Sequence, residues 1–186
     1  LGGTVNLGDG TTSTTFPTQL KNVSQGMNFD GGDYLAVPTA AVPATGAFTV
    51  AFFAKVDDIS TARGLCGQFY DVVGSRFLFG VNATIIFGQI GGTTLSQAHG
   101  GVILNRVCHY VFGRDDSNNT SLYLDGIEIN TGTNSTTVDQ QAMDIGRYNE
   151  GAANAPWSGD IYTARVYDFA LTPTQIKWLF NRDLRL

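Results

Sequence analysis

The segment Ser158–Phe180 reads SGDIYTARVYDFALTPTQIKWLF, and its pattern changes halfway along. Up to Tyr167 apolar and polar residues alternate, which is typical of a β-strand. Thr172 then stands where a helix N-cap is expected, Pro173 takes the first helical position, and Gln175 completes a capping box. The segment predicts a long last strand, a tight corner and one short helix.

The predicted helix has a single apolar face. Ile176, Leu179 and Phe180 recur at spacings of three and four residues, so they can press together against another element. Trp178 lies between them in sequence, and we expect it to contact the edge of the sheet. The pattern therefore predicts a helix that packs against a β domain, and it says nothing yet of function.

The amino-acid composition favours strands and turns. The chain has 186 residues, of which 23 are glycine, and glutamate occurs only at Glu128 and Glu150. Strong helix formers are thus scarce, while Thr, Val, Phe, Tyr and Asn are common. A chain of this length suits one domain of ordinary size. We predict a single all-β domain.

The charge excludes two classes of partner. Eleven Lys and Arg residues against 16 Asp and Glu residues give a net charge of -5, and no stretch concentrates the positive charges. A surface for nucleic acid or for an anionic membrane is therefore not expected. The longest mainly apolar run, residues 47–54, is far shorter than the roughly 20 residues that span a bilayer, so membrane insertion is not expected either.

The two cysteines, Cys66 and Cys108, both lie among apolar residues. Small buried thiols are the favoured interpretation, because the pair does not form the framework of a disulfide-rich scaffold. A disulfide between them is the alternative.

The chain divides into two parts. Residues 1–20 are rich in Gly and Thr and predict an N-terminal arm or an edge strand, and residues 21–186 predict the domain itself. Residues 48–56 alternate between an inner face that is apolar and an outer face that is half apolar. We therefore expect another element to cover part of the outer face. Asp125-Gly126 between two alternating runs predicts a two-residue hairpin turn.

Four segments, in order, resemble one family of proteins. They are MNFDGGDYLAVP (27–38), FTVAFFAKV (48–56), RVCHYVFGRDDSNNTSLYLDGIEI (106–129) and IGRYNEGAANAPWSGDIYTARVYDFALTPTQI (145–176). In this order they are similar to the signature of laminin-G-like, concanavalin A-like jelly rolls. Phe53 and Cys108 stand where that family commonly has Trp. The resemblance implies an antiparallel β-sandwich with one short C-terminal helix, and it leaves function open.

The family includes glycoside hydrolases, whose members with this fold carry Glu-x-Asp-x-x-Glu on a strand. Two carboxyl groups must flank the scissile bond, and that motif is absent here. Asp115 and Asp116 lie in a turn-like run and predict a solvated loop, while His109 is predicted to be structural. We expect no catalytic activity and no catalytic residues.

Many members of the family hold calcium through Asp and Asn side chains and backbone carbonyls. The resemblance makes calcium the one candidate cofactor, with Asp30, Asp33 and Asp160 as predicted ligands. The alternative for these residues is turn chemistry, since Asp beside Gly caps its own backbone.

Sugar binding on this fold combines stacking aromatic residues with Asn and Asp hydrogen bonds. We expect Tyr70 and Tyr148 to be exposed on loops, while Trp157 occupies a position that usually plugs the core. The predicted ligand-binding residues are Tyr70, Asp71, Tyr148, Asn149, Asn154 and Trp157.

These features favour a non-catalytic recognition or adhesion module that binds glycans or a glycoprotein surface outside the cell. The alternative is a structural or decoration protein of a virion, such as a phage head or tail, or of another extracellular assembly, whose partners are neighbouring subunits. We predict a location that is extracellular or on a virion surface.

Overall fold

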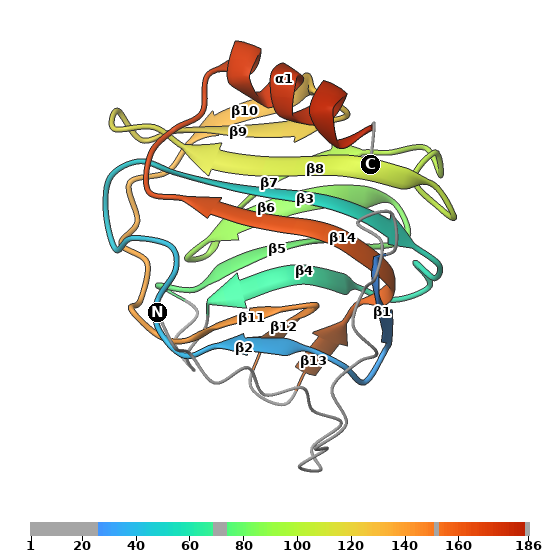
Figure 1. Ribbon diagram of the computed structural model, residues 1–186. Helices are drawn as coiled ribbons and strands as arrows, with labels where there is room; N and C mark the ends of the chain where they lie inside the picture. Colours follow the sequence, from blue (N-terminus) through green and yellow to red (C-terminus); the bar gives the residue numbers. More distant parts are fainter. Residues whose placement is uncertain (1–25, 69–73, 151–152, 185–186) are drawn as a thin grey trace.

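The computed structural model describes residues 26–68, 74–150 and 153–184. Within these residues, two six-stranded antiparallel sheets pack face to face, and one helix, α1 (Pro173–Asp183), lies outside them (Figure 1). The predicted all-β sandwich with a short C-terminal helix is confirmed. The predicted N-terminal arm, residues 1–20, lies outside the described residues.

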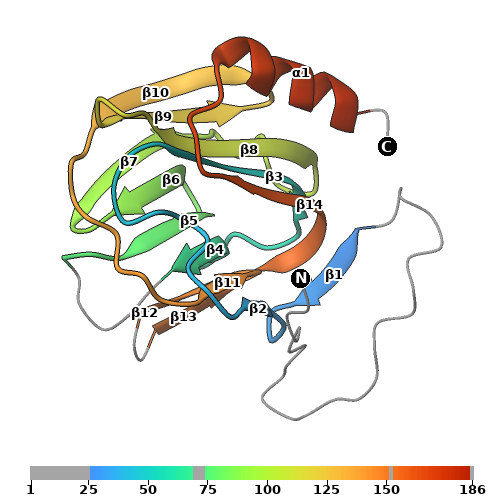
Figure 2. The same cartoon turned by 60° about the vertical axis from the view of Figure 1, so that its left-hand side comes forward.

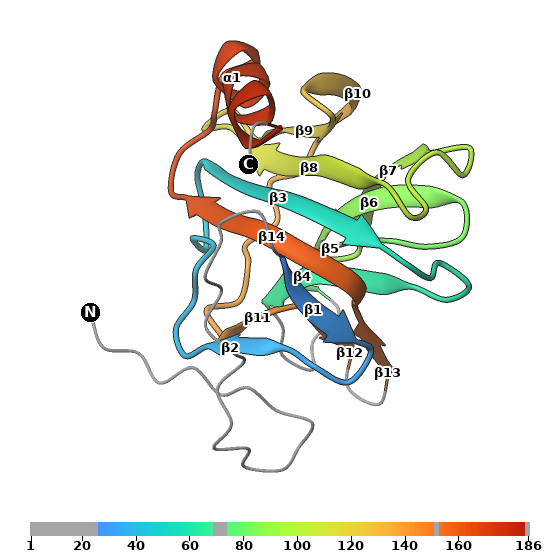
Figure 3. The ribbon, with the colours of Figure 1, turned by 45° about the vertical axis from the view of Figure 1, so that its right-hand side comes forward.

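The sheet that α1 covers is called the helix sheet. Its strand order is β1-β14-β3-β8-β9-β10, and Figure 3 shows it as a layer separate from the second sheet. Its strands are β1 (Met27–Asp30), β3 (Phe48–Val56), β8 (Val107–Arg114), β9 (Asn119–Leu124), β10 (Ile127–Thr133) and β14 (Ser158–Tyr167).

The second sheet is called the ribbon sheet, because a two-stranded ribbon covers part of its outer face. Its order is β2-β11-β4-β5-β6-β7. Its strands are β2 (Leu35–Val37), β4 (Arg63–Gln68), β5 (Phe77–Val81), β6 (Ile85–Ile90), β7 (Thr93–Ala98) and β11 (Met143–Ile145), and the ribbon consists of β12 (Arg147–Glu150) and β13 (Ala153–Pro156).

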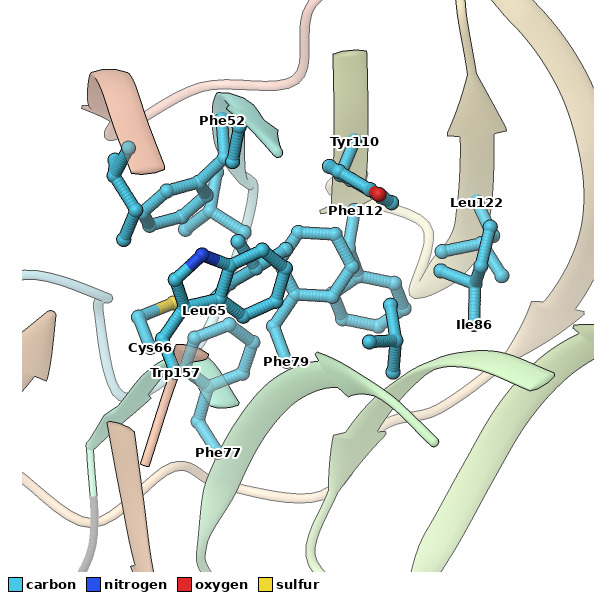
Figure 4. Close-up of a cluster of buried hydrophobic side chains, with 14 of the residues drawn as sticks. Phe52, Leu65, Cys66, Phe77, Phe79, Ile86, Tyr110, Phe112, Leu122 and Trp157 are labelled. Atoms are coloured by element: carbon cyan, nitrogen blue, oxygen red, sulfur yellow. The ribbon is translucent and has the colours of Figure 1, made fainter. Parts of the chain in front are cut away.

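The core between the sheets contains many aromatic side chains (Figure 4). Phe48 and Phe77 meet edge to face with centroids 5.4 Å apart, and Trp157 is fully buried with its Nε1 donating to the Lys55 carbonyl at 3.1 Å. Aromatic pairs in this geometry stabilise a core beyond the area that they bury.

Both cysteines are buried free thiols, as the favoured interpretation predicted. Burial raises the pKa of each thiol, that of Cys108 to about 11. Both side chains therefore stay protonated at neutral pH and behave as small apolar groups.

Helix α1 begins as the sequence predicts. The Thr172 side chain accepts from the Gln175 backbone N–H at 3.3 Å, and the Gln175 side chain accepts from the Thr172 N–H at 2.8 Å. Ile176 packs with Ala51, Val111 and Tyr123 of the helix sheet, and Leu179 is also buried. Figure 2 shows α1 lying over the strands of this sheet. The capping box and the apolar face are both confirmed.

The expected contact of Trp178 with the sheet is wrong. Trp178 is 59% exposed, and the Arg182 guanidinium lies 4.8 Å from its ring centroid. At about 100° per residue, position 178 lies roughly 160° around the helix from the buried Ile176 and roughly 100° from the buried Leu179, and so outside the buried face. The ring therefore faces solvent.

The hairpin predicted at Asp125-Gly126 is confirmed, because both residues have positive φ angles, 52° and 76°. A type I′ turn requires this conformation at both central positions.

Four strands, β4, β7, β12 and β13, lie in segments that the sequence pattern does not predict as strands. β4 carries Gly64 and Gly67, and β7 is a polar edge strand, so neither shows a clear alternation.

No helix among the described residues combines the length and apolar character needed to cross a lipid bilayer.

Candidate functional site

The sequence-predicted ligand residues fall on two parts of the fold. Tyr148, Asn149 and Asn154 lie on the β12–β13 ribbon, where Asn149 pairs with Asn154 across the strands and Tyr148 pairs with Ala155. Tyr70 and Asp71 lie outside the described residues. Trp157 follows the ribbon and points into the core.

Tyr148 is buried, and the prediction that it is exposed is wrong. Its ring meets Phe87 edge to face with centroids 5.9 Å apart, and only 7% of the residue is exposed. A Cβ atom on Gly67 would lie 2.6 Å from the Tyr148 Cβ, so a glycine in β4 makes room for it. Tyr148 packs the ribbon onto the sheet.

Trp157 is likewise no platform for stacking a sugar, because it is fully buried in the core cluster. The sequence position that usually plugs the core does so here. Two of the predicted aromatic contacts are thereby removed from any exposed binding surface.

The predicted calcium ligands are engaged with other groups. The Asp160 carboxylate accepts from Asn28 Nδ2 at 2.9 Å and pairs with Lys55 Nζ at 3.1 Å, and Lys55 also pairs with Asp57. Hydrogen bonds with these two aspartates, Asp57 first, raise the pKa of Lys55, so an ammonium ion already supplies the positive charge.

The other two acidic candidates stabilise a turn. Asp30 accepts from the Gly32 N–H at 2.9 Å, and Asp33 accepts from the Asp30 N–H at 3.4 Å. No group of three His, Cys, Asp or Glu side chains in the described part of the chain lies close enough to hold a metal ion. Turn chemistry accounts for the contacts of Asp30 and Asp33, and the calcium site stays a prediction.

A groove of about 330 Å³ opens on the outer face of the helix sheet, beside the first turn of α1. Its floor comes from β3, β8, β9 and β10, and its wall is the connection from β14 to α1 (Figure 1). Residues 170–173 form the wall. The apolar residues Val111 and Ile176 also line the groove. The remaining lining residues lie on the floor and are mainly polar: Thr49, Gly113, Arg114, Asp115, Asn119, Ser121, Tyr123 and Glu128.

Tyr123 and Glu128 form the strongest polar contact in this groove. The Tyr123 hydroxyl donates to Glu128 Oε2 at 2.6 Å, and the two residues are direct partners across the β9–β10 hairpin. Burial, followed by this hydrogen bond, raises the pKa of Tyr123 to about 12. At neutral pH the phenol keeps its proton and holds the Glu128 carboxylate in place.

Asp115 lies at the end of the groove and is fixed within its own loop. Its carboxylate accepts from the Ser117 N–H, the Asn119 N–H and Asn119 Nδ2, each at 2.8 Å. The hydrogen bonds with Asn119, followed by that with Ser117, hold the pKa of Asp115 below its usual value. The predicted loop is confirmed, and its aspartate is charged.

The wall of the groove is held by Thr49 in β3. Its hydroxyl donates to the Phe169 carbonyl at 3.0 Å and accepts from the Leu171 N–H at 2.9 Å. Together with the capping box at Thr172, these bonds fix the connection from β14 to α1 in the absence of a ligand. The site is preorganised.

The sequence pattern does not predict the groove, although it contains one local signal for a polar pair in it. A two-residue turn at Asp125-Gly126 places Tyr123 opposite Glu128, so this pair follows from the hairpin. No local pattern shows that Thr49 and Leu171, far apart in the chain, meet across the same opening.

Comparison with solved structures finds the same fold in several proteins. Domain 4 of AbnA, a GH43 extracellular arabinanase from Geobacillus stearothermophilus in complex with arabinotriose, superimposes with a TM-score of 0.68 at 19% identity, over 96% of this chain and 82% of that one. A putative carbohydrate binding protein from Bacteroides ovatus gives a TM-score of 0.65 at 19% identity, over 82% of this chain and 46% of that one.

Domains LG4-5 of the mouse laminin alpha1 chain give a TM-score of 0.62 at 13% identity, over 77% of this chain and 40% of that one. This chain thus spans less than half of the length of the solved Bacteroides chain and of the solved laminin fragment. At such identities the likeness shows the fold alone. No curated protein sequence matches the chain. The family model of the concanavalin A-like lectin/glucanases superfamily matches residues 29–177, and the chain belongs to this superfamily.

Proposed function

We propose that the chain is a non-catalytic glycan-recognition module that works outside the cell, and that the groove beside α1 is its binding site. One observation carries this proposal: a preorganised groove of about 330 Å³ presents hydroxyl, amide and carboxylate groups together. Sugars are recognised by such groups, because each sugar hydroxyl both donates and accepts hydrogen bonds.

The structural neighbours support a sugar as the ligand. One is described in complex with arabinotriose, one as a putative carbohydrate binding protein, and a further neighbour, botulinum neurotoxin type C, as dependent on two ganglioside molecules for cell entry. The neurotoxin superimposes with a TM-score of 0.57 at 12% identity. Laminin and an extracellular arabinanase also support a place outside the cell.

The absence of catalysis is part of the proposal, and the state of the carboxylates supports it. A glycoside hydrolase keeps one of two carboxyl groups protonated as its general acid. In the groove, the hydrogen bonds of Asp115 hold it charged, and Glu128 accepts a hydrogen bond from the Tyr123 hydroxyl. Asp115 therefore lacks the surroundings that keep a general acid protonated.

A glycan array with the fluorescently labelled chain tests this function. We expect saturable binding, which Ser121→Trp abolishes because the indole would fill the groove from the middle of its floor. Gln97→Trp adds the same bulk on the exposed edge strand β7 and should bind like the wild type. Circular dichroism would establish that each variant is folded.

The result also distinguishes the groove from the ribbon. If Asn154→Ala abolishes binding and Ser121→Trp does not, the ribbon residues predicted from the sequence form the site, and the groove is not the site. A folded wild-type chain that binds no glycan would contradict the proposed function and favour a structural subunit of an extracellular assembly.

A further inference from the structure

We propose that the groove selects uncharged or positively charged sugars and rejects sugars that carry a carboxylate or sulfate. This inference rests on the proposed function, since it specifies the class of glycan that the same groove accepts. It follows from the charges that line the groove and from the partners of each charged group.

The negative charges of the groove belong to two carboxylates. Glu128 is exposed and held by Tyr123, whose hydroxyl takes one of the roughly four acceptor positions of a carboxylate. Asp115 lies at the other end and is charged for the reasons given above. Both groups can accept hydrogen bonds from sugar hydroxyl or ammonium groups, and neither can donate one to an anion.

The cationic residue in the lining, Arg114, offers no hydrogen bond to an anion in the groove. Its side chain is 1% exposed, and its guanidinium donates to the carbonyls of Gly46 at 2.9 Å and Thr136 at 2.7 Å. The same group lies 5.4 Å from the Phe48 ring centroid. Arg114 thus points into the protein and has no donor directed at a ligand in the groove.

The N-terminus of α1 borders the groove, but most of its donors are already used. Pro173 has no N–H, and the Gln175 N–H bonds to the Thr172 side chain. A helix end attracts anions through its free N–H groups, and little of that attraction is left here. The charged groups that face a ligand in the groove are therefore its two carboxylates.

The expected discrimination is modest in size and measurable. Two charges some 6–8 Å from a ligand anion, at the dielectric constant of the bulk water that fills an open groove, weaken binding about tenfold at low salt, and screening reduces the factor as salt rises. We expect a sialylated, sulfated or uronic acid-bearing glycan to bind about tenfold more weakly than the same neutral core.

The experiment uses a glycan array that carries neutral cores beside their acidic forms, followed by calorimetry on one pair. Wild type should prefer the neutral form, and Glu128→Gln, which keeps the shape and an acceptor for Tyr123, should reduce the preference about threefold. Asp33→Asn removes the same charge from the β1–β2 turn, away from the groove, and should leave the preference unchanged.

Three results would overturn the inference. Equal or tighter binding of the acidic forms, with Ser121→Trp still abolishing binding, overturns the charge selectivity and leaves the proposed function standing. A preference that Glu128→Gln and Asp33→Asn change equally reflects net charge and overturns the assignment to the groove. Absence of all glycan binding overturns the proposed function and this inference together.

Discussion

Single glycines decide how closely the ribbon packs on its sheet. β4 carries Gly67 directly below Tyr148, and an added Cβ would approach the Tyr148 Cβ to 2.6 Å, well inside normal contact. Because both atoms belong to the stiff part of their residues, neither can move aside without shifting a strand. The absence of one side chain thus allows another to be buried.

We predict that Gly67→Ala lowers the free energy of unfolding by about 1–3 kcal/mol through overpacking. Gly92 is the matched control, since a Cβ there meets nothing within 4 Å. Urea unfolding of both variants checks this prediction. A Gly67→Ala variant as stable as Gly92→Ala would show that the ribbon is not packed in this way.

At the scale of elements, α1 is tied to the helix sheet at both ends. The capping box and Thr49 hold its beginning, and at its end Arg165 of β14 pairs with the buried Asp183 at 2.5 and 3.1 Å. Between these ends, His109 of β8 lies fully buried under the helix, with ring centroids 6.1 Å from Phe180 and 6.3 Å from Phe53.

From this burial we expect the stability of the fold to be sensitive to acid. Neither ring nitrogen of His109 has a hydrogen-bond partner among the described residues. Burial, opposed by the nearby Asp183, lowers the pKa of His109 to about 4, whereas an unfolded chain has an ordinary value of about 6.5. Below pH 6.5 the unfolded state therefore binds the proton more readily.

We predict that the free energy of unfolding falls by roughly 2–3 kcal/mol between pH 6.5 and pH 4, because the unfolded chain binds a proton at His109 that the folded chain does not. His109→Phe keeps the ring contacts and removes the titration, so its stability should decline less over this range. Chemical denaturation of both proteins at several pH values provides the measurement. Parallel curves for the two proteins would contradict the assignment to His109.

At the scale of the whole molecule, the net charge of -5 does not create a cation site in the described residues. The candidate carboxylates are already satisfied by Lys55, Asn28 or turn N–H groups. A calcium ion would have to displace an ammonium ion to use Asp160. Groups of the chain itself thus balance the charge or the hydrogen bonds of these carboxylates.

We predict that neither millimolar calcium nor EDTA changes the Tm by more than about 1 °C, because a ligand that does not bind the native state cannot stabilise it. Thermal unfolding followed by circular dichroism checks this. A rise of several degrees with calcium, abolished by Asp160→Asn, would restore the calcium site that the family resemblance implies.

The candidate site could be predicted only where its contacts are local. The pairing of Tyr123 with Glu128 follows from a two-residue turn, and the start of α1 follows from Thr172 and Gln175. The exposure of Tyr148 and Trp178 could not be predicted, because each depends on a surface that another part of the chain provides or does not provide.

The sequence by itself determined the strands with clear alternation, the Asp125-Gly126 turn and the capped helix, because these depend on contacts between near neighbours in the chain. The tertiary structure decided which aromatic residues are buried, that Lys55 holds Asp160, and that Thr49 meets Leu171 to close the groove. Such contacts join distant residues, and only the packing of the two sheets and α1 brings those residues together.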